Sequence, residues 1–366
     1  PGDQWRPRIW GENVVWADWR NDYTTDVDIY AWSPEGGERA VCTAPGFQNE
    51  PVIWDNRIVW TDDRNFDVSS TDIHAWDPAN GEYVICNAPL WQHSPTIYED
   101  NIVWSDERNF VDTGADLWGW NPVRGQYPVH IAPGFQEAPA LHGGTLAWTE
   151  EYGPAEIEYD IYASIGGGPA QAICTVLGWQ LSPAVYEQTI VWEDWRNDDG
   201  NRSNSDIYAW DPVNGERAIC TAPGHQEAPA IYGDIIVWED DRNAEETGHD
   251  IYAWDPINGE RVVCNAPGDQ TVPAIHGANI VWSDARNYSY TGLDIYGFFG
   301  WDEASKADVN GDGNTDEADL QTFIEAFKRS RGGDVVNERC DMNGDDRLTQ
   351  EDARIFLEAW LADHAV

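Results

Sequence analysis

Lysine is almost absent from this chain, methionine occurs once, and long apolar runs are missing. Lys306 and Lys328 are the only lysines, and 66 acidic against 21 basic residues give a formal net charge of −45 at pH 7. No stretch reaches the roughly 18 consecutive apolar residues that a membrane-spanning helix needs, so we expect no membrane span. Such an acidic surface repels phosphates, which excludes nucleic-acid binding, and it suits calcium, basic partners or salty surroundings.

Cysteine is scarce and its placement argues against disulfide bonds. Five of the six cysteines share one column of a repeat, and His130 takes that column in the third unit: Cys42, Cys86, Cys174, Cys220 and Cys264. A disulfide needs Cα atoms within about 7 Å, and equivalent positions of neighbouring units should lie farther apart. We therefore expect buried thiols that pack as small apolar groups.

Tryptophan, by contrast, is abundant and recurs at a fixed period. Seven anchors stand 44 residues apart, with one spacing of 46: Trp16, Trp60, Trp104, Trp148, Trp192, Trp238 and Trp282. A fixed period in this range indicates a repeat architecture.

Each unit contains four short apolar segments, A to D. In the fifth unit they begin "QLSPAVYEQ", "TIVWED", "DIYAWDPVNGE" and "RAICTAPGHQ". Runs of Ile, Val, Tyr and Trp bounded by Asn, Asp, Gly and Pro predict strands. Strand C is apolar on both faces, so both must be covered, and four-stranded sheets that stack radially form a β-propeller. We predict an all-β, seven-bladed propeller over residues 1–301, with the tryptophans of strands B and C packed between blades rather than forming a ligand site.

The repeats resemble a known family. "PAIYGDIIVWEDDRN" followed by "DIYAWDPINGE" is similar to the Tol-B-type propeller repeat, particularly in arrays on secreted and cell-surface proteins. The likeness covers residues 1 to about 300. It implies the fold alone, because such propellers host binding, scaffolding and catalysis alike.

Two further columns recur so regularly that we interpret them as structural. An Asp-x-Arg-Asn turn follows strand B in six units, as in Asp194, Arg196 and Asn197, and predicts an Asp–Arg pair at one rim of each blade. A glutamine opens strand A in all seven units and predicts a polar belt. The fourth unit departs from the pattern, since "TEEYGPAEIEYD" lacks the Arg-Asn turn, and either drift or a site could explain this.

The tail, residues 306–366, follows another pattern. "DVNGDGNTDEAD" and "DMNGDDRLTQED" are twelve-residue loops with oxygen-bearing residues at the spacing that calcium uses, and each precedes an apolar helical stripe. The predicted ligands of the first loop are Asp308, Asn310, Asp312, the carbonyl of Asn314, Asp316 and Asp319; those of the second are Asp341, Asn343, Asp345, the carbonyl of Arg347, Thr349 and Asp352. Ligands and stripes repeat with an offset of 33 residues. We predict two Ca²⁺ sites in a small all-α domain.

This tail resembles a dockerin module, which implies an extracellular or cell-surface setting where calcium is near millimolar. The resemblance also implies a cohesin-like or other surface protein as partner. The loop positions that carry partner specificity hold Glu317-Ala318 and Gln350-Glu351 instead of the frequent Ser-Thr, and Asp346 replaces the usual glycine of the second loop. We therefore expect a partner other than an ordinary cellulosomal cohesin, and weaker calcium binding in the second loop.

A candidate ligand site lies where the D–A turns form one mouth of the ring. The residue before each glutamine is aromatic on four consecutive units and histidine on the next: Phe47, Trp91, Phe135, Trp179 and His225. Exposed aromatic faces bind sugars and partner proteins, although the same rings could cap the core between blades.

Two classes of function remain open. The even repeats favour a secreted or cell-surface, non-catalytic binding or scaffold protein that recognises a polysaccharide or protein at the mouth. The alternative is a carbohydrate-active enzyme, a polysaccharide lyase or glycoside hydrolase, that carries a dockerin. Its candidate acid, base and neutralising groups are His93, His225, Arg6, Glu50, Glu137 and Glu227, whose spacing demands no particular chemistry.

The ends of the repeat region predict an incomplete last blade. The chain opens at strand A, and the seventh unit runs through strand C (about residues 294–299) directly into the tail. We expect a three-stranded seventh blade. Because open edges invite pairing, we also expect the tail or a neighbouring molecule to cover strand C.

Overall fold

The computed structural model describes residues 2–21, 23–151, 158–198, 200–201, 203–299, 309, 317–329, 340, 353 and 356. The chain divides into two compact units. The first comprises Pro1–His276 and Ile280–Gly297, and the second comprises Phe298–Val366 with Gly277–Asn279.

The first unit is built of short antiparallel strands. Blades 1 to 3 consist of β1 (Gln4–Trp10), β2 (Asn13–Asp18), β3 (Asp28–Ser33) and β4 (Gly37–Cys42); β5 (Gln48–Trp54), β6 (Arg57–Asp62), β7 (Asp72–Asp77) and β8 (Gly81–Cys86); and β9 (Gln92–Tyr98), β10 (Asn101–Asp106), β11 (Asp116–Asn121) and β12 (Gly125–His130). Blades 4 and 5 consist of β13 (Phe135–His142), β14 (Thr145–Glu151), β15 (Tyr159–Ser164) and β16 (Gln171–Cys174); and β17 (Gln180–Tyr186), β18 (Thr189–Asp194), β19 (Asp206–Asp211) and β20 (Gly215–Cys220). Blades 6 and 7 consist of β21 (Gln226–Tyr232), β22 (Ile235–Asp240), β23 (Asp250–Asp255) and β24 (Gly259–Cys264); and β25 (Gln270–His276), β26 (Asn279–Asp284) and β27 (Asp294–Phe298).

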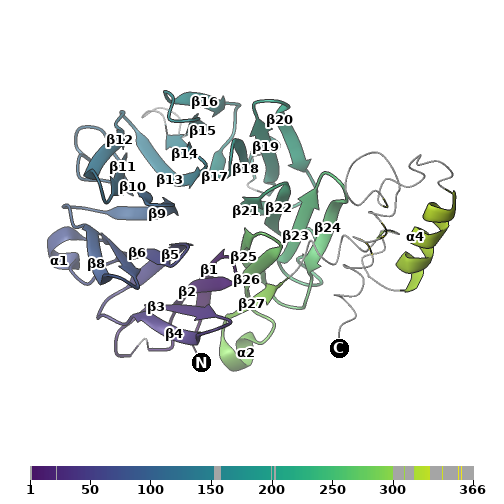
Figure 1. Ribbon diagram of the computed structural model, residues 1–366. Helices are drawn as coiled ribbons and strands as arrows, with labels where there is room; N and C mark the ends of the chain where they lie inside the picture. The colour runs from purple at the N-terminus through teal and green to yellow at the C-terminus, as the bar shows by residue number, and fades with distance from the viewer. Residues whose placement is uncertain are drawn as a thin grey trace. The chain divides into compact units, whose positions relative to one another are not determined.

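These sheets confirm the predicted seven-bladed propeller. Six sheets have four strands and the described part of the seventh has three, each ordered as in the sequence. The first strand of every blade faces the axis of the ring (Figure 1). Single helical turns, α1 (Phe66–Ser69) and α2 (Tyr288–Thr291), occupy the B–C loops of blades 2 and 7, and no sequence periodicity predicted them.

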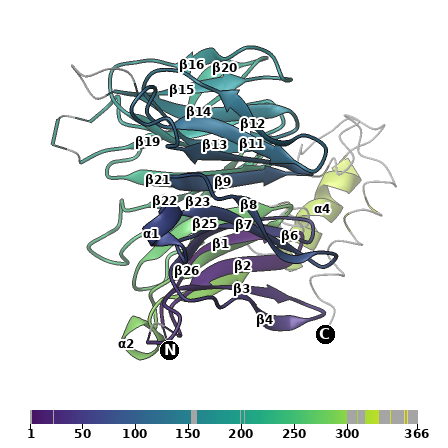
Figure 2. The same cartoon turned by 90° about the vertical axis from the view of Figure 1, so that its left-hand side faces the viewer.

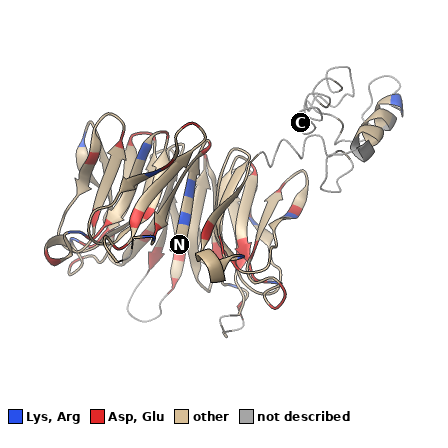
Figure 3. Ribbon diagram, turned by 90° about the horizontal axis from the view of Figure 1, so that it is seen from below, with Lys and Arg blue, Asp and Glu red and all other residues tan. Residues whose placement is uncertain are grey.

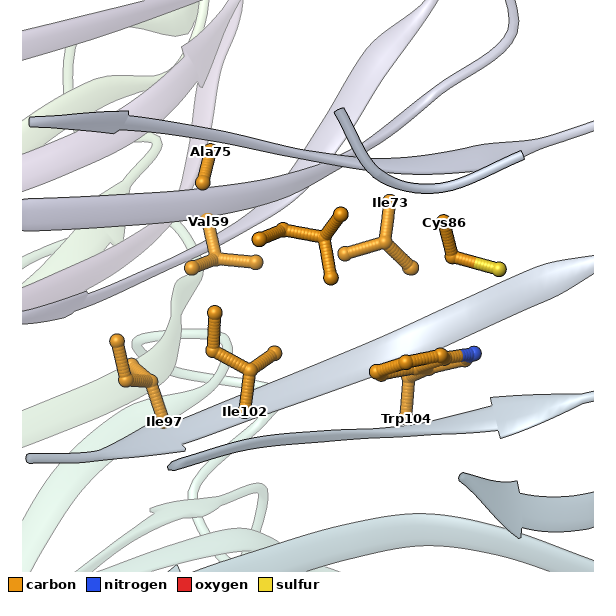
Figure 4. Close-up of a cluster of buried hydrophobic side chains, with 8 residues drawn as sticks. Val59, Ile73, Ala75, Cys86, Ile97, Ile102 and Trp104 are labelled. Carbon is orange, nitrogen blue, oxygen red and sulfur yellow. The ribbon is translucent and has the colours of Figure 1, made fainter. Parts of the chain in front are cut away.

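The core lies between blades, where one sheet's face packs on the next. Val59, Ile73 and Cys86 of blade 2 face Ile102 and Trp104 of blade 3 in one cluster (Figure 4). All seven anchor tryptophans are at most 4% exposed. The predicted packing role of these tryptophans is therefore confirmed, and each blade depends on its neighbours for burial of its apolar faces.

The Asp-x-Arg-Asn turn ties neighbouring blades together. The Arg64 guanidinium donates two hydrogen bonds to the Asp62 carboxylate, at 2.8 and 2.6 Å, and the Trp60 indole N–H donates a third, at 3.0 Å. Arg64 also reaches the Sγ of Cys42 in the preceding blade at 3.1 Å. Although burial alone would raise it, hydrogen bonds from Arg64 and Trp60 hold the pKa of Asp62 below its usual value.

In the fourth unit, which lacks the Asp–Arg pair, other residues make the corresponding contact between blades 3 and 4. Glu150 replaces the aspartate and accepts the hydrogen bond from the Trp148 indole N–H at 2.9 Å. His130, in the cysteine column of blade 3, lies 3.8 Å from Glu150 and its ring centroid is 5.0 Å from that of Trp148. Two departures from the repeat thus form one altered contact between blades 3 and 4.

Blades 1 and 7 are joined by the same type of backbone hydrogen bond as other neighbouring blades. The Gln4 backbone N–H donates to the Leu293 carbonyl at 2.9 Å, just as Gln48 donates to Val27 across the interface of blades 1 and 2. β1 and β25 lie side by side in both ribbon views (Figures 1 and 2). Non-covalent contacts between blades 1 and 7 therefore close the ring.

The described part of the second unit has a small apolar core. Helix α4 (Glu317–Arg329) carries Phe323, which stacks on Phe356 with ring centroids 4.3 Å apart. Val309 and Cys340 are buried in the same cluster. Phe323 and Phe356 are equivalent positions of the two tail repeats, so the two apolar stripes meet at least here.

The blade cysteines carry free thiols, as predicted. Burial raises the pKa of Cys86 to about 11 and that of Cys42 to about 12. No helix within the described residues is long and apolar enough to cross a membrane.

Candidate functional site

The inner strand of every blade is kinked at one position. The residue before the strand's proline has a φ of 48 to 52° although none is glycine: Arg6, Glu50, Ser94, Ala138, Ser182, Ala228 and Val272. This conformation is unfavourable for side chains with a Cβ, above all for a β-branched residue such as Val272. Carboxylates of the preceding blade hold three of the kinks: Glu50 accepts from the Ser94 N–H at 2.8 Å, Glu239 from the Val272 N–H at 3.0 Å, and Glu193 from the Ala228 N–H.

The glutamines at the D–A mouth are structural. All except Gln4 are fully buried. The side-chain amides of Gln48 and Gln180 each donate to the carbonyl two residues earlier, at 3.0 and 2.8 Å, which holds the turn into strand A. Their regular recurrence follows from this local role.

The mouth aromatics lie on separate blades and pair with B–C loop residues rather than with one another. Trp91 packs edge-on against Phe66 (5.8 Å between centroids), Phe135 against Phe110 (5.8 Å), and Phe47 against Trp19 (6.0 Å). Trp195 lies between Trp179 (5.8 Å) and His225 (5.2 Å). Trp91 is 44% exposed and the other four are half-buried.

Acidic side chains lie close to one of these aromatic residues, Phe135. The position after the Asp-x-Arg-Asn aspartate is Glu107 in blade 3, and Glu151 occupies it in blade 4. Burial raises the pKa of both carboxyls, and the charge of Glu137 adds to the increase for each. The mouth therefore carries an arc of aromatic patches, with a group of carboxylates beside Phe135.

Blades 5 and 6 hold a cluster of acids and histidines that sequence reasoning missed in part. Burial and the neighbouring Glu227 raise the pKa of Glu193 to about 8, while its carboxylate accepts a hydrogen bond from the Trp195 indole at 2.6 Å. Glu239 lies 2.7 Å from His249, and this hydrogen bond raises the pKa of His249 to about 9. The sequence does mark this cluster: in blades 5 and 6 a glutamate, Glu193 or Glu239, directly follows the anchor tryptophan, where the other blades have Ala, Ser or Thr.

The predicted catalytic candidates do not converge on one point. Arg6 and Glu50 form an ion pair at 2.8 Å on blades 1 and 2. His225 and Glu227 lie 3.5 Å apart on the other side of the ring, with Glu227 on blade 6. His93 contacts Ser94 on blade 3 at 3.3 Å.

The inner strands enclose a central channel with a volume of about 530 Å³. Its lining is mostly Pro, Ala, Val, Ile and Leu, and its charged residues are Arg6, Arg8 and Glu50. The Arg8 guanidinium donates to the Pro7 carbonyl at 2.9 Å. Burial and the neighbouring Arg6 charge lower the pKa of Arg8 to about 10.

The last residue of each inner strand contributes to a closed aromatic collar at the A–B end of the channel. It comprises Trp10, Trp54, Tyr98, His142, Tyr186, Tyr232 and His276, and ring centroids of successive members lie 4.4 to 6.1 Å apart around the full circle. Burial lowers the pKa of His142 and of His276. Sequence reasoning overlooked this column, although an aromatic residue or histidine stands there in every unit.

The predicted calcium ligands lie outside the described residues, apart from the backbone of Asp319 in α4. Elsewhere in the described ranges, no group of three or more His, Cys, Asp or Glu side chains could hold a metal ion. Acidic residues recur from blade to blade and basic ones are few (Figure 3).

Comparison with known protein families identifies the tail of the chain. Residues 306–356 match the family described as the Dockerin type I domain. The chain thus joins a seven-bladed propeller to a dockerin domain.

The propeller is similar to propellers of peptidases. The propeller domain of the Trilobed protease from Pyrococcus furiosus, described as having an open velcro topology, superimposes with a TM-score of 0.61 at 12% identity over 82% of this chain and 93% of that one. An acylaminoacyl peptidase of Pyrococcus horikoshii gives 0.60 at 13% identity over 82% and 51%, and a puromycin-hydrolyzing peptidase of Mycobacterium tuberculosis gives 0.56 at 14% over 77% and 48%.

These likenesses show the fold alone. The chain spans about half the length of the two peptidases. No curated protein matches it by sequence.

Proposed function

We propose that this chain is a secreted, extracellular or cell-surface binding protein whose propeller mouth recognises a polysaccharide and whose dockerin domain attaches it to a cohesin-bearing partner. The observation that carries the proposal is the arc of aromatic patches at the D–A mouth, with carboxylates beside Phe135. Pyranose rings stack on aromatic faces. Carboxylates accept hydrogen bonds from sugar hydroxyls.

The charge of the mouth narrows the class of polysaccharide. Glu107, Glu137 and Glu151 gather beside Phe135, so a uronate chain would meet like charges there. We therefore favour a neutral polysaccharide. A basic protein surface is the alternative ligand that the same charges would attract.

The donor set of the tail fits calcium. Asp308, Asn310, Asp312, Asp316 and Asp319 in the first loop, and Asp341, Asn343, Asp345, Thr349 and Asp352 in the second, would supply oxygen ligands, together with the carbonyls of Asn314 and Arg347. Val309, between two proposed ligands, is 1% exposed, and Cys340, directly before Asp341, is fully buried. Both loops would thus start from an anchored residue, and bound calcium would order them for docking.

The polysaccharide assignment is tested by a glycan array probed with the full chain in calcium buffer. We expect neutral polysaccharides among the ligands, and Trp91→Ala should weaken binding at least about tenfold because an exposed stacking face is lost. Trp32→Ala is the matched control, since Trp32 is 37% exposed on the outer part of blade 1. Equal affinities of wild type and Trp91→Ala for every hit would refute a role of the mouth.

One observation favours the enzyme alternative. With a pKa of about 8, Glu193 is mainly protonated at neutral pH beside Glu227, and a protonated acid next to a carboxylate is the pair that glycoside hydrolysis uses. Array ligands should be incubated with wild type and Glu193→Gln and the products analysed. Reducing ends or unsaturated sugars released by wild type alone would favour a glycosidase or lyase.

The domain boundaries 1–301 and 306–366 belong to the same proposal. If they are right, each piece expressed alone should keep its own binding activity, for the glycan and for a cohesin respectively. Loss of glycan binding by residues 1–301 would mean that the tail contributes to the mouth.

A further inference from the structure

Arg8 is the only charged residue at its position in the seven inner strands. The matching positions of the remaining inner strands hold Val52, Thr96, Ala140, Ala184, Ala230 and Ala274, and all of them line the channel. The repeat therefore needs no long or charged side chain there. A structural role in the blade does not explain why blade 1 has arginine.

The Arg8 charge is not neutralised by an ion pair within the described residues. Its one hydrogen bond there goes to the Pro7 carbonyl. The adjacent Glu50 is occupied on both oxygens, one by Arg6 at 2.8 Å and the other by the Ser94 N–H at 2.8 Å. Arg8 is half-buried in the channel wall, and partly desolvating a charge without a partner is costly, so a cation kept in this position points to an anion that binds there.

Desolvation of Arg8 and the like charge of Arg6 disfavour the guanidinium and outweigh the favourable charge of the nearby Glu50, so the pKa of Arg8 is lowered. An anion beside Arg8 would offset both effects. A carboxylate suits the planar guanidinium, because two parallel hydrogen bonds can form between them.

The other residues that line the channel limit the kind of ligand whose carboxylate could reach Arg8. Around Arg8 the walls are a ring of prolines and small apolar side chains, with few hydroxyl groups, among them Ser94 and Thr96. The aromatic collar constricts the A–B end. A ligand chain would therefore enter the channel end-first, from the D–A mouth. An apolar ligand suits these walls better than a sugar, whose hydroxyl groups need many hydrogen-bond partners.

We propose that the central channel binds a short apolar chain end that terminates in a carboxylate, such as a polypeptide C-terminus, with the carboxylate on Arg8. The volume of about 530 Å³ lies within the usual range of small-ligand sites. This site is separate from the polysaccharide-binding mouth proposed above, since none of the five mouth aromatics lines the channel.

The test uses the full chain and two probes, an N-acetylated tripeptide of alanine, valine and alanine as the free acid and as its C-terminal amide. Calorimetry should show that the acid binds and that the amide binds at least about tenfold more weakly, because a charge-assisted hydrogen-bonded pair is lost. Arg8→Gln should lose the same factor for the acid. The melting temperature of Arg8→Gln should equal or exceed that of wild type, because a half-buried charge without an ion-pair partner is removed.

Arg124→Gln is the matched control, since it removes the same charge from an exposed C–D turn and should leave affinity unchanged. No binding of the acid at millimolar concentration, or equal affinity of acid and amide, would overturn the proposal. So would Arg8-dependent binding of an oligouronate in preference to the peptide acid. Glycan binding by Arg8→Gln reports on the mouth independently and should remain intact.

Discussion

Carboxylates of this propeller differ in their chemistry because of the groups that surround them. Asp62 is fully buried but receives hydrogen bonds from Arg64 and Trp60, which hold its pKa low. Glu193 is almost as buried, at 7% exposure, and no arginine among the described residues bonds to it; burial and, in addition, the charge of Glu227 raise its pKa to about 8. The partner rather than the depth of burial decides which carboxylate stays charged at neutral pH.

Glu193 should make the stability of the propeller fall as the pH rises from about 4.5 to about 8. Its pKa is higher in the folded than in the unfolded chain, so its contribution to stability is present below about pH 4.5 and is lost as the pH rises through about 8. Glu193→Gln should therefore be more stable than wild type at pH 9 and differ little at pH 5. Melting temperatures at both pH values test this.

Glu35→Gln, on an exposed turn, is the control for that experiment. A Glu193→Gln variant whose melting temperature falls equally at both pH values would show that the carboxyl is needed for its hydrogen bonds to Trp195 and Ala228. The raised pKa would then not govern stability.

At the scale of the element, the unit of stability is the interface between two blades. Arg108 pairs with Asp106, lies 3.1 Å from the Cys86 sulfur of the preceding blade, and stacks over Trp118 with its guanidinium carbon 3.7 Å from the ring centroid. Five such interfaces pair an arginine with the cysteine of the blade before, at 3.0 to 3.2 Å. Loss of one arginine therefore affects two blades.

Arg64→Ala should destabilise the propeller by about 3–5 kcal/mol, because it leaves the buried Asp62 carboxylate without its cation. Arg124→Ala, which removes an exposed arginine, should stay within about 0.5 kcal/mol of wild type. Chemical denaturation of the two variants measures both values. Similar small effects would mean that the Asp–Arg pair adds nothing to the Trp60 hydrogen bond.

The strands and core of the blades could be predicted from the sequence, whereas the contacts at the candidate site could not, because only the former repeat. Strand positions, the packed tryptophans and the three-stranded described part of blade 7 follow from local patterns that repeat, since each blade solves the same packing problem. The raised pKa of Glu193 depends on Glu227 of the next blade, and the partners of Trp91 and Phe135 come from loops whose sequences vary between units. Contacts of this kind are made once and leave no period to detect.

At the scale of the whole molecule, the chain combines a ring that is closed by non-covalent contacts with a dockerin domain. The contact between Gln4 and Leu293 repeats the geometry of the other interfaces, so blade 1 meets blade 7 as a normal neighbour. On the proposal above, the dockerin domain would give the molecule a second binding function that depends on calcium rather than on the propeller.

Removing calcium should destabilise the tail and leave the propeller unchanged. Ligands that bind only the folded state stabilise it, by about 2.7 kcal/mol at a concentration one hundred times the dissociation constant. Chelation should therefore abolish the melting transition of residues 306–366 in calorimetry. Asp308→Ala should remove one of two sites in a calcium titration. A tail transition that survives chelation would contradict the calcium assignment.

A bridging measurement tests whether one molecule binds a polysaccharide through its propeller and a cohesin through its tail. The full chain is captured on a surface coated with a neutral polysaccharide found on the array, and a cohesin outside the ordinary cellulosomal type, as Glu317-Ala318 and Gln350-Glu351 call for, is then added in calcium. We predict that the cohesin is retained, that chelation releases the cohesin but not the chain, and that Trp91→Ala prevents capture of both. Capture that is unaffected by Trp91→Ala would show that the mouth does not bind the polysaccharide, and cohesin retention that is unaffected by chelation would show that the tail does not dock through calcium.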